Sequence, residues 1–366
     1  MERSNAIKVL AALTVAVFVF KAFPIADSST VPPGWVDTSY HTSTSLDVSS
    51  GDYDSLMHPW WHIQDNSETI DGLSVIDRNS KTFFYPPFLH VFTASFMLFL
   101  PAGLATIISI SLIYSLSAPA TYLLSRSYDL DRTSSLLGAA LTAGSIPLIH
   151  SQIMGFWSFA AAFIFSIISF SYYRLHRKSG DRKYLAGYLI AGLASILTHW
   201  VFGAFVAGMP LLNTLLEEKT VDWKIPGFAL VSSVPFYTAF FATSSISSYI
   251  TTSFDRFYPS ISPAIVIGGL IVSKGKHKAV DVFSIGSLAG ALLYYTGLSI
   301  PFGGMIQFAL PVLAGFYIAT IHNQITSEEL KKAVAVLTSI FIIASMFSQA
   351  AIGHNANRAL TESEFN

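Results

Sequence analysis

The chain contains no cysteine among its 366 residues. This absence excludes disulfides, thiolate metal ligands and cysteine nucleophiles, and it leaves the redox compartment open. Charged residues are also scarce, at 12% of the chain, and the formal net charge is only -1. So small a net charge provides no basic field for nucleic acid, and we expect no nucleic-acid partner.

Several catalytic signatures are missing as well. The sequence has no His-Glu-x-x-His of zinc proteases, no Gly-x-Gly-Asp of intramembrane aspartyl proteases and no glycine-rich nucleotide loop. These absences exclude zinc proteases, intramembrane aspartyl proteases and enzymes with a glycine-rich nucleotide loop.

What the chain has in abundance is apolar residues, at 52% of the sequence. This composition predicts a single all-α, multi-pass membrane domain over residues 1–366. A crossing needs about twenty mostly apolar residues, which gives about eleven spans. We place them near 6–25, 104–125, 133–149, 154–174, 184–199, 201–216, 225–246, 261–273, 279–297, 303–322 and 332–351.

Basic residues predict the orientation. With the N-terminus inside, sixteen of the 21 basic residues fall in inner loops, as the positive-inside rule prefers for a plasma-membrane protein. This holds only if the short apolar segment 87–101 is a juxtamembrane or re-entrant helix rather than a span. The first helix is alternatively a cleaved signal, which leaves the remaining topology unchanged.

A polar loop over residues 26–86 follows the first helix and would lie outside. Loops of about sixty residues are uncommon unless functional. This loop carries nine of the 22 acidic residues, together with His41, His58 and His62. We therefore place the candidate active site in it.

Asp37 is the candidate general base, because a partly desolvated carboxylate at the membrane surface can take a proton from an attacking hydroxyl. His41 follows at i+4, so both would share one face of a helix. The structural alternative makes Asp37 the N-cap of a surface helix over residues 40–46.

His58 and His62 repeat the i, i+4 spacing on either side of Trp60 and Trp61. With His41 they form a candidate divalent-metal site, although no complete ligand motif is present and no cofactor is certain. The other interpretation is that the histidines hydrogen-bond a sugar or phosphate while a tryptophan ring stacks on it. We interpret Trp157, in contrast, as an aromatic anchor at the lipid headgroups.

Two further candidates lie outside the loop. Arg256 is an outward-facing cation that would stabilise a leaving phosphate, or alternatively an interfacial anchor paired with Asp255. His199, at the outer end of a helix, would contribute to substrate binding across the cavity.

The order of these features resembles the GT-C superfamily of membrane glycosyltransferases. The resemblance rests on an acidic residue early in a long first external loop, here in Val36-Asp37-Thr38, and on Phe84-Tyr85-Pro86-Pro87 opening a partly buried helix. It covers about the first 200 residues. One departure is that residues 150–158 lack the acidic motif of the oligosaccharyltransferases, which argues against a metal-dependent transfer of that kind.

The resemblance implies a glycosyltransferase that moves a sugar from a polyprenyl-phosphate carrier to a glycan, protein or lipid acceptor at the outer face of the membrane, with Asp37 and His41 catalytic. It also implies substrate binding near Tyr85. Two alternatives from other classes remain, a lipid or small-molecule transporter or flippase, and a non-catalytic membrane subunit. The first would show inverted repeats and charged residues at mid-membrane.

Overall fold

The computed structural model describes residues 2–26, 36–51, 87–145, 157–199, 202–218, 262–295 and 309–343, with the single residues 227, 231 and 234. These residues are mostly helical and include no strand, which confirms the all-α prediction. Two of the described helical segments, Ala102–Ser127 and Trp157–Ser179, are long and apolar enough to cross a membrane. The other described helices do not meet both criteria, so the predicted number of spans is not supported by this test.

The helices nevertheless fall where the apolar segments predict them. Their bounds are α1 Arg3–Ala26, α2 Val36–Ser49, α4 Phe88–Met97, α5 Ala102–Ser115, α6 Ser117–Ser127, α7 Arg132–Ala143, α9 Trp157–Ser179, α10 Arg182–Ile196, α11 Phe202–Asn213, the π-helical turn η1 Thr214–Glu218, α14 Ser262–Ser273, α15 Lys278–Tyr295, α17 Ala309–Gln324 and a last helix over residues 328–343. The expected span over 225–246 lies mostly outside the described residues.

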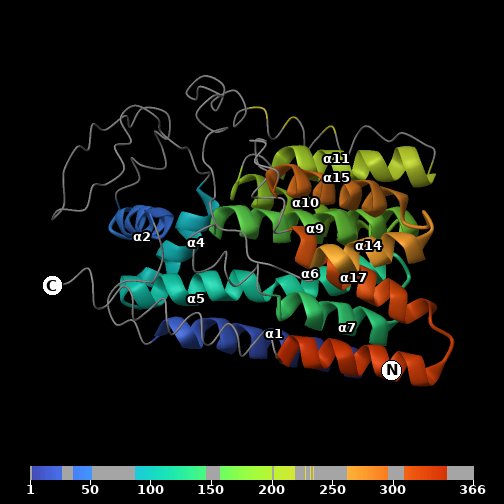
Figure 1. The fold of residues 1–366 in the computed structure, drawn as a ribbon. Coiled ribbons are helices and arrows are strands. Elements are labelled where there is room, and N and C mark those ends of the chain that lie inside the picture. The colour runs from blue at the N-terminus through green and yellow to red at the C-terminus, as the bar shows by residue number, and fades with distance from the viewer. Residues whose placement is uncertain are drawn as a thin grey trace.

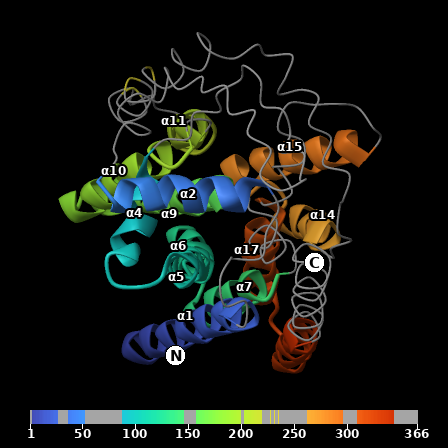
Figure 2. The same cartoon turned by 90° about the vertical axis from the view of Figure 1, so that its left-hand side faces the viewer.

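The helix α9 is the central element of the bundle. It lies between α10 and α6 in both views and also contacts α11 and α5 (Figures 1 and 2). Its side chains from Trp157 to Phe163 are all buried, as expected for a helix surrounded by protein. Phe163, Phe170 and Tyr173 join the main core, and Trp157 joins a smaller core with Leu89 of α4 and Tyr114 of α5.

Two prolines each remove a backbone hydrogen bond within a helical segment. At one of them, a tyrosine hydroxyl donates to the carbonyl that the proline leaves without its helical partner. Pro119 has no N–H to donate to the carbonyl of Ser115, and the segment Ala102–Ser127 breaks into α5 and α6 at Leu116. Pro210 similarly cannot bond the carbonyl of Val206 inside α11. The hydroxyl of Tyr188 from α10 donates to that carbonyl at 3.3 Å, so the group lost to proline is satisfied across the helix interface.

Small residues let α7 and α17 approach closely. A Cβ at Gly138 would lie 2.2 Å from the carbonyl oxygen of Gly315. Beside them, the Thr142 hydroxyl lies 3.0 Å from that of Thr121 and 3.2 Å from the carbonyl oxygen of Pro311, so hydroxyl groups connect α6, α7 and α17. Close backbone contact with hydroxyl bridges is how helices pack where lipid removes the hydrophobic driving force.

The inner turns predicted from charge lie together at one end of the bundle, which we call the charged end. It comprises the turns 128–131, 179–181, 274–277 and 325–327 together with η1. Lys178 pairs with Asp129 at 2.5 Å, Arg177 with Glu218 at 2.6 Å, and the amide of Asp131 donates to Asn323 at 2.9 Å. These contacts join turns that are distant in the sequence.

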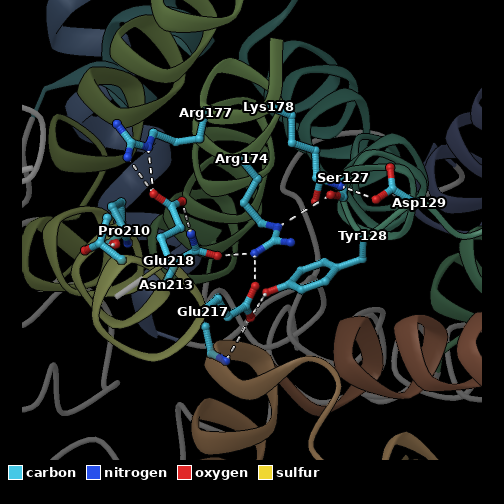
Figure 3. Close-up of polar contacts among 12 residues, drawn as sticks. Ser127, Tyr128, Asp129, Arg174, Arg177, Lys178, Pro210, Asn213, Glu217 and Glu218 are labelled. Carbon is cyan, nitrogen blue, oxygen red and sulfur yellow. Dashed lines mark hydrogen bonds and ion pairs between the residues drawn. The ribbon is translucent and has the colours of Figure 1, made fainter. Parts of the chain in front are cut away.

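Arg174 of α9 is the centre of this end (Figure 3). Its guanidinium donates to Asn213 of α11 and to Glu217 of η1, and it lies 3.5 Å from the centroid of the Tyr128 ring. Glu217 also accepts from the Tyr128 hydroxyl and from the amide of Ala279 in α15, each at 3.2 Å. The side chains of Arg174 and Glu217 are only 10% and 16% exposed, so the pair is largely desolvated and needs all of these partners.

His277 closes the charged end from the α14–α15 turn. Its ring lies against the Tyr128 ring at 4.9 Å and the Phe316 ring at 5.3 Å, both edge to face. Burial lowers the pKa of His277 below its ordinary value of 6.5, and the nearby Asp281 and Glu217 carboxylates only partly oppose this. The folded protein therefore holds this imidazole in its neutral form.

We expect Gly138→Ala to destabilise the protein by about 1 to 3 kcal/mol, because the added methyl group forces α7 and α17 apart. Gly286→Ala is the matched control, since Gly286 also lies in a helix and a Cβ there meets nothing within 4 Å. Thermal unfolding in detergent measures both. Equal midpoints for the two variants would contradict the close approach.

We also expect acid to destabilise the wild type more than His277→Phe, which keeps the ring contacts and removes the titratable group. Well above pH 6.5 His277 is neutral in both the folded and the unfolded chain and adds no pH dependence. As the pH falls below that value the unfolded chain binds a proton first, so the free energy of unfolding decreases. Unfolding midpoints measured from about pH 7 to about pH 5 would show a smaller loss for the variant; identical slopes would count against the buried neutral imidazole.

Candidate functional site

The helix α2 carries the two residues predicted to be catalytic. Asp37 lies in its first turn and His41 one turn later, and the side chain of Asp37 is outside the described part of the structure. His41, Thr44, Ser45 and Val48 are buried, and α2 packs against α4 and α5. The helix begins at Val36, so the predicted alternative in which Asp37 is the N-cap residue is wrong.

The short helix α4 packs against α2. It follows Pro86 and Pro87, spans ten residues and buries Leu89, His90, Thr93 and Ala94. Its first amide, of Phe88, donates to the carbonyl of Leu197 after α10 at 2.9 Å, and the Thr93 hydroxyl lies 3.0 Å from that of Ser109 in α5. Ten residues are too few for a span, and the re-entrant position in a membrane stays a prediction.

His41 and His90 form a buried pair that connects α2 to α4. Nδ1 of His41 lies 2.9 Å from Nε2 of His90, and both residues are at most 2% exposed. One nitrogen of this contact donates and the other accepts, so the two facing atoms share a single proton. The pair therefore carries at most one positive charge, because a second would place two N–H groups head to head.

Trp157, the first residue of α9, completes the contact. The His41 ring stacks on it with centroids 5.8 Å apart and an angle of 28° between the planes. Trp157 is 3% exposed, so its interpretation as an aromatic anchor at the headgroups is wrong. The tryptophan instead packs α2 against the central helix α9.

His199 lies at this same end of the bundle, two residues beyond Leu197, the residue that binds the start of α4. Its buried ring contacts Phe159 of α9 at 5.3 Å and Phe202 of α11 at 6.1 Å, edge to face. The contribution of His199 to substrate binding stays a prediction.

The remaining predicted site residues lie outside the described residues: His58, Trp60, Trp61, His62, Tyr85 and Arg256. The described residues contain no group of three or more metal-ligating side chains. Since two of the three predicted metal ligands are not among them, the divalent-metal hypothesis is untested.

Sequence reasoning did not select His90 or Trp157 as site residues. His90 follows the Pro86-Pro87 pair by three residues and lies on the buried face of α4, a position that patterns of sequence neighbours do not connect to His41. The available signal for His90 was that it is the one ionisable residue of a short, mostly apolar helix. For Trp157 the sequence offered no signal of a site residue beyond its position at the start of a helix.

We expect the His41–His90 contact to show coupling in a double-mutant cycle. His41→Phe and His90→Phe each leave a buried nitrogen facing an apolar ring, which costs about 1 to 3 kcal/mol. The double variant removes both nitrogens, so its loss should be smaller than the sum of the single losses by about 1 kcal/mol. Thermal unfolding of the four proteins measures this coupling, and strictly additive losses would contradict the contact.

No protein-family model matches the chain, and no curated protein is found to be similar to it.

Proposed function

We propose that this protein is a multi-pass membrane glycosyltransferase of the GT-C type, which moves a sugar from a polyprenyl-phosphate donor to a glycan, protein or lipid acceptor at the outer face of the plasma membrane. The observation that carries the proposal is the packing of α2 against α4. Asp37 lies one turn before His41, and His41 is bound by His90 of the short helix that follows Tyr85-Pro86-Pro87. The backbone of Asp37 and the buried histidine pair thereby lie on two packed helices at one end of the bundle, which supports the proposal.

The distribution of charge supports the membrane part of the proposal. No Asp, Glu, Lys or Arg occurs over residues 88–125, 133–173, 184–216 or 282–321, so the helices are uncharged between their ends. Large apolar side chains are exposed around the bundle, among them Ile190 of α10, Ile271 of α14 and Leu337 of the last helix. Water disfavours so much exposed apolar surface, whereas lipid does not. We therefore propose about eleven spans, the N-terminus and the charged end inside, and α2 outside.

In the proposed reaction Asp37 is the general base. The acceptor hydroxyl oxygen forms a bond to the anomeric carbon, the bond from that carbon to the phosphate oxygen breaks, and polyprenyl phosphate leaves with the electron pair. The carboxylate of Asp37 takes the hydroxyl proton. His41, fixed by His90 and Trp157, is one turn away in α2 and is proposed to hold the acceptor or the protonated carboxyl group in place.

The other predicted residues receive proposed roles in binding. Arg256 would face the departing phosphate, because fixed positive charge stabilises the negative charge that develops there. His58, Trp60, Trp61, His62, Tyr85 and His199 are proposed to bind the sugar and the phosphate. A divalent metal held by His41, His58 and His62 is the alternative arrangement of the same side chains.

A transporter would need charged or broken segments at mid-membrane. In the described helices from α4 onward, the charged residues lie within about two turns of the charged end, with Arg174 five residues before the end of α9 and Asp281 in the first turn of α15. The described spans therefore favour an enzyme with its chemistry at one end over a carrier with a central charged site.

We expect Asp37→Asn to lower transfer from a radiolabelled polyprenyl-phosphate sugar by about 100-fold or more, since a general base contributes about that factor. The assay uses the full chain in proteoliposomes with mannose and glucose donors. Asp47→Asn is the matched control, because Asp47 is an exposed carboxylate in the same helix. Full transfer by Asp37→Asn would refute the role of Asp37. Lipid scrambling without transfer by the wild type would identify a flippase instead.

A further inference from the structure

The turn between α14 and α15 differs from the rest of the charged end in its lysines. Lys274, Lys276 and Lys278 are all exposed, and none forms an ion pair with a described residue. The other parts of this end each contain at least one ion pair, formed by Lys178 with Asp129, Arg177 with Glu218, Lys183 with Asp181 and Lys331 with Glu328. We call residues 274–278 the lysine turn.

The two described carboxylates near the lysine turn already accept hydrogen bonds from other residues. Asp281 accepts from the Ser273 hydroxyl at 2.9 Å and from the Tyr317 hydroxyl at 2.7 Å. Glu217 accepts from Arg174, Tyr128 and the amide of Ala279. Both acids face inward, so the three lysines present their positive charges to the surroundings without a partner among the described residues.

The lysine turn is nevertheless a fixed structure. Lys274 and Gly275 adopt left-handed conformations, with φ of 51° and 73°, and the amide of Lys276 donates to the carbonyl of Ser273 at 3.0 Å. On its inner side His277 is held between the Tyr128 and Phe316 rings. Three like charges within five residues repel one another, and this backbone keeps them together.

Exposed apolar residues flank the lysine turn on both helices. Ile267 and Ile271 of α14 are 50% and 70% exposed, and Ile271 lies three residues before Lys274. Val282 and Ile285 of α15 are 46% and 57% exposed, and Val282 lies one helical turn after Lys278. Unpaired cations next to exposed apolar side chains match a molecule with an anionic head and hydrocarbon tails.

We propose that the lysine turn binds the headgroup phosphate of an anionic phospholipid, with its acyl chains on the exposed faces of α14 and α15. A free phosphate would account for the lysines and not for the apolar flanks. The phospholipid belongs to the leaflet at the charged end, on the opposite side from α2. This inference rests on the membrane embedding of the proposed function and not on glycosyl transfer.

The test is native mass spectrometry of the full chain in non-ionic detergent, titrated with phosphatidylglycerol. Lys274→Gln/Lys276→Gln/Lys278→Gln should weaken retention of this lipid by about tenfold or more, because juxtamembrane lysines are attracted to anionic headgroups. The matched control is Lys178→Gln/Lys183→Gln/Lys331→Gln, which removes the same charge from lysines that are already paired. It should retain the lipid as the wild type does.

Three further measurements separate loss of charge from loss of fold and a bound phospholipid from a bound phosphate. Lys274→Arg/Lys276→Arg/Lys278→Arg should bind like the wild type, which separates loss of charge from loss of fold. Phosphatidylcholine should bind all variants alike, and excess inorganic phosphate should not displace phosphatidylglycerol completely. Equal weakening in both glutamine variants, or complete displacement by phosphate, would overturn the proposal. Failure of the chain to remain in membranes after carbonate extraction would refute the proposed function as well, whereas full transfer by Asp37→Asn would refute the role of Asp37 and leave the lysine-turn proposal unaffected.

Discussion

The half-buried ion pair between Arg174 and Glu217 is the contact on which the arrangement of the helices depends. Through it α9 is joined to η1, and through the other partners of Glu217 to Tyr128 and to the first turn of α15. Removal of one member would leave an uncompensated buried charge, at a cost of about 3 to 5 kcal/mol. The pair therefore fixes both the position and the rotation of α9 at the charged end.

The opposite end of α9 contacts α2, the helix that holds the proposed catalytic residues. Trp157 begins α9 about 25 Å from Arg174 along the helix axis. The stacking of His41 on Trp157 and its hydrogen bond with His90 then place α2 across the end of the bundle. The charged end thus fixes the helices relative to one another, and the end with the histidines is where we propose that the chemistry takes place.

Much of this fold could be predicted from the sequence, because long uncharged segments with charged residues at their ends specify helices directly. The helices α9 and α14 begin within a few residues of their expected positions. The extent of α2 was underestimated, since its serines and threonines are weak helix formers and only the buried face of His41, Thr44 and Ser45 explains the longer helix. Contacts such as His41–His90, 49 residues apart, depend on tertiary packing that local patterns do not encode.

The central claim is that the reaction takes place beside α2, at the end of the bundle that holds the histidine pair. A cryo-electron microscopy map of the chain in nanodiscs with a polyprenyl phosphate tests it most directly. The account predicts phosphate density next to α2 and α4, within reach of Asp37 and His41. Phosphate density at the charged end, with none beside α2, would contradict it.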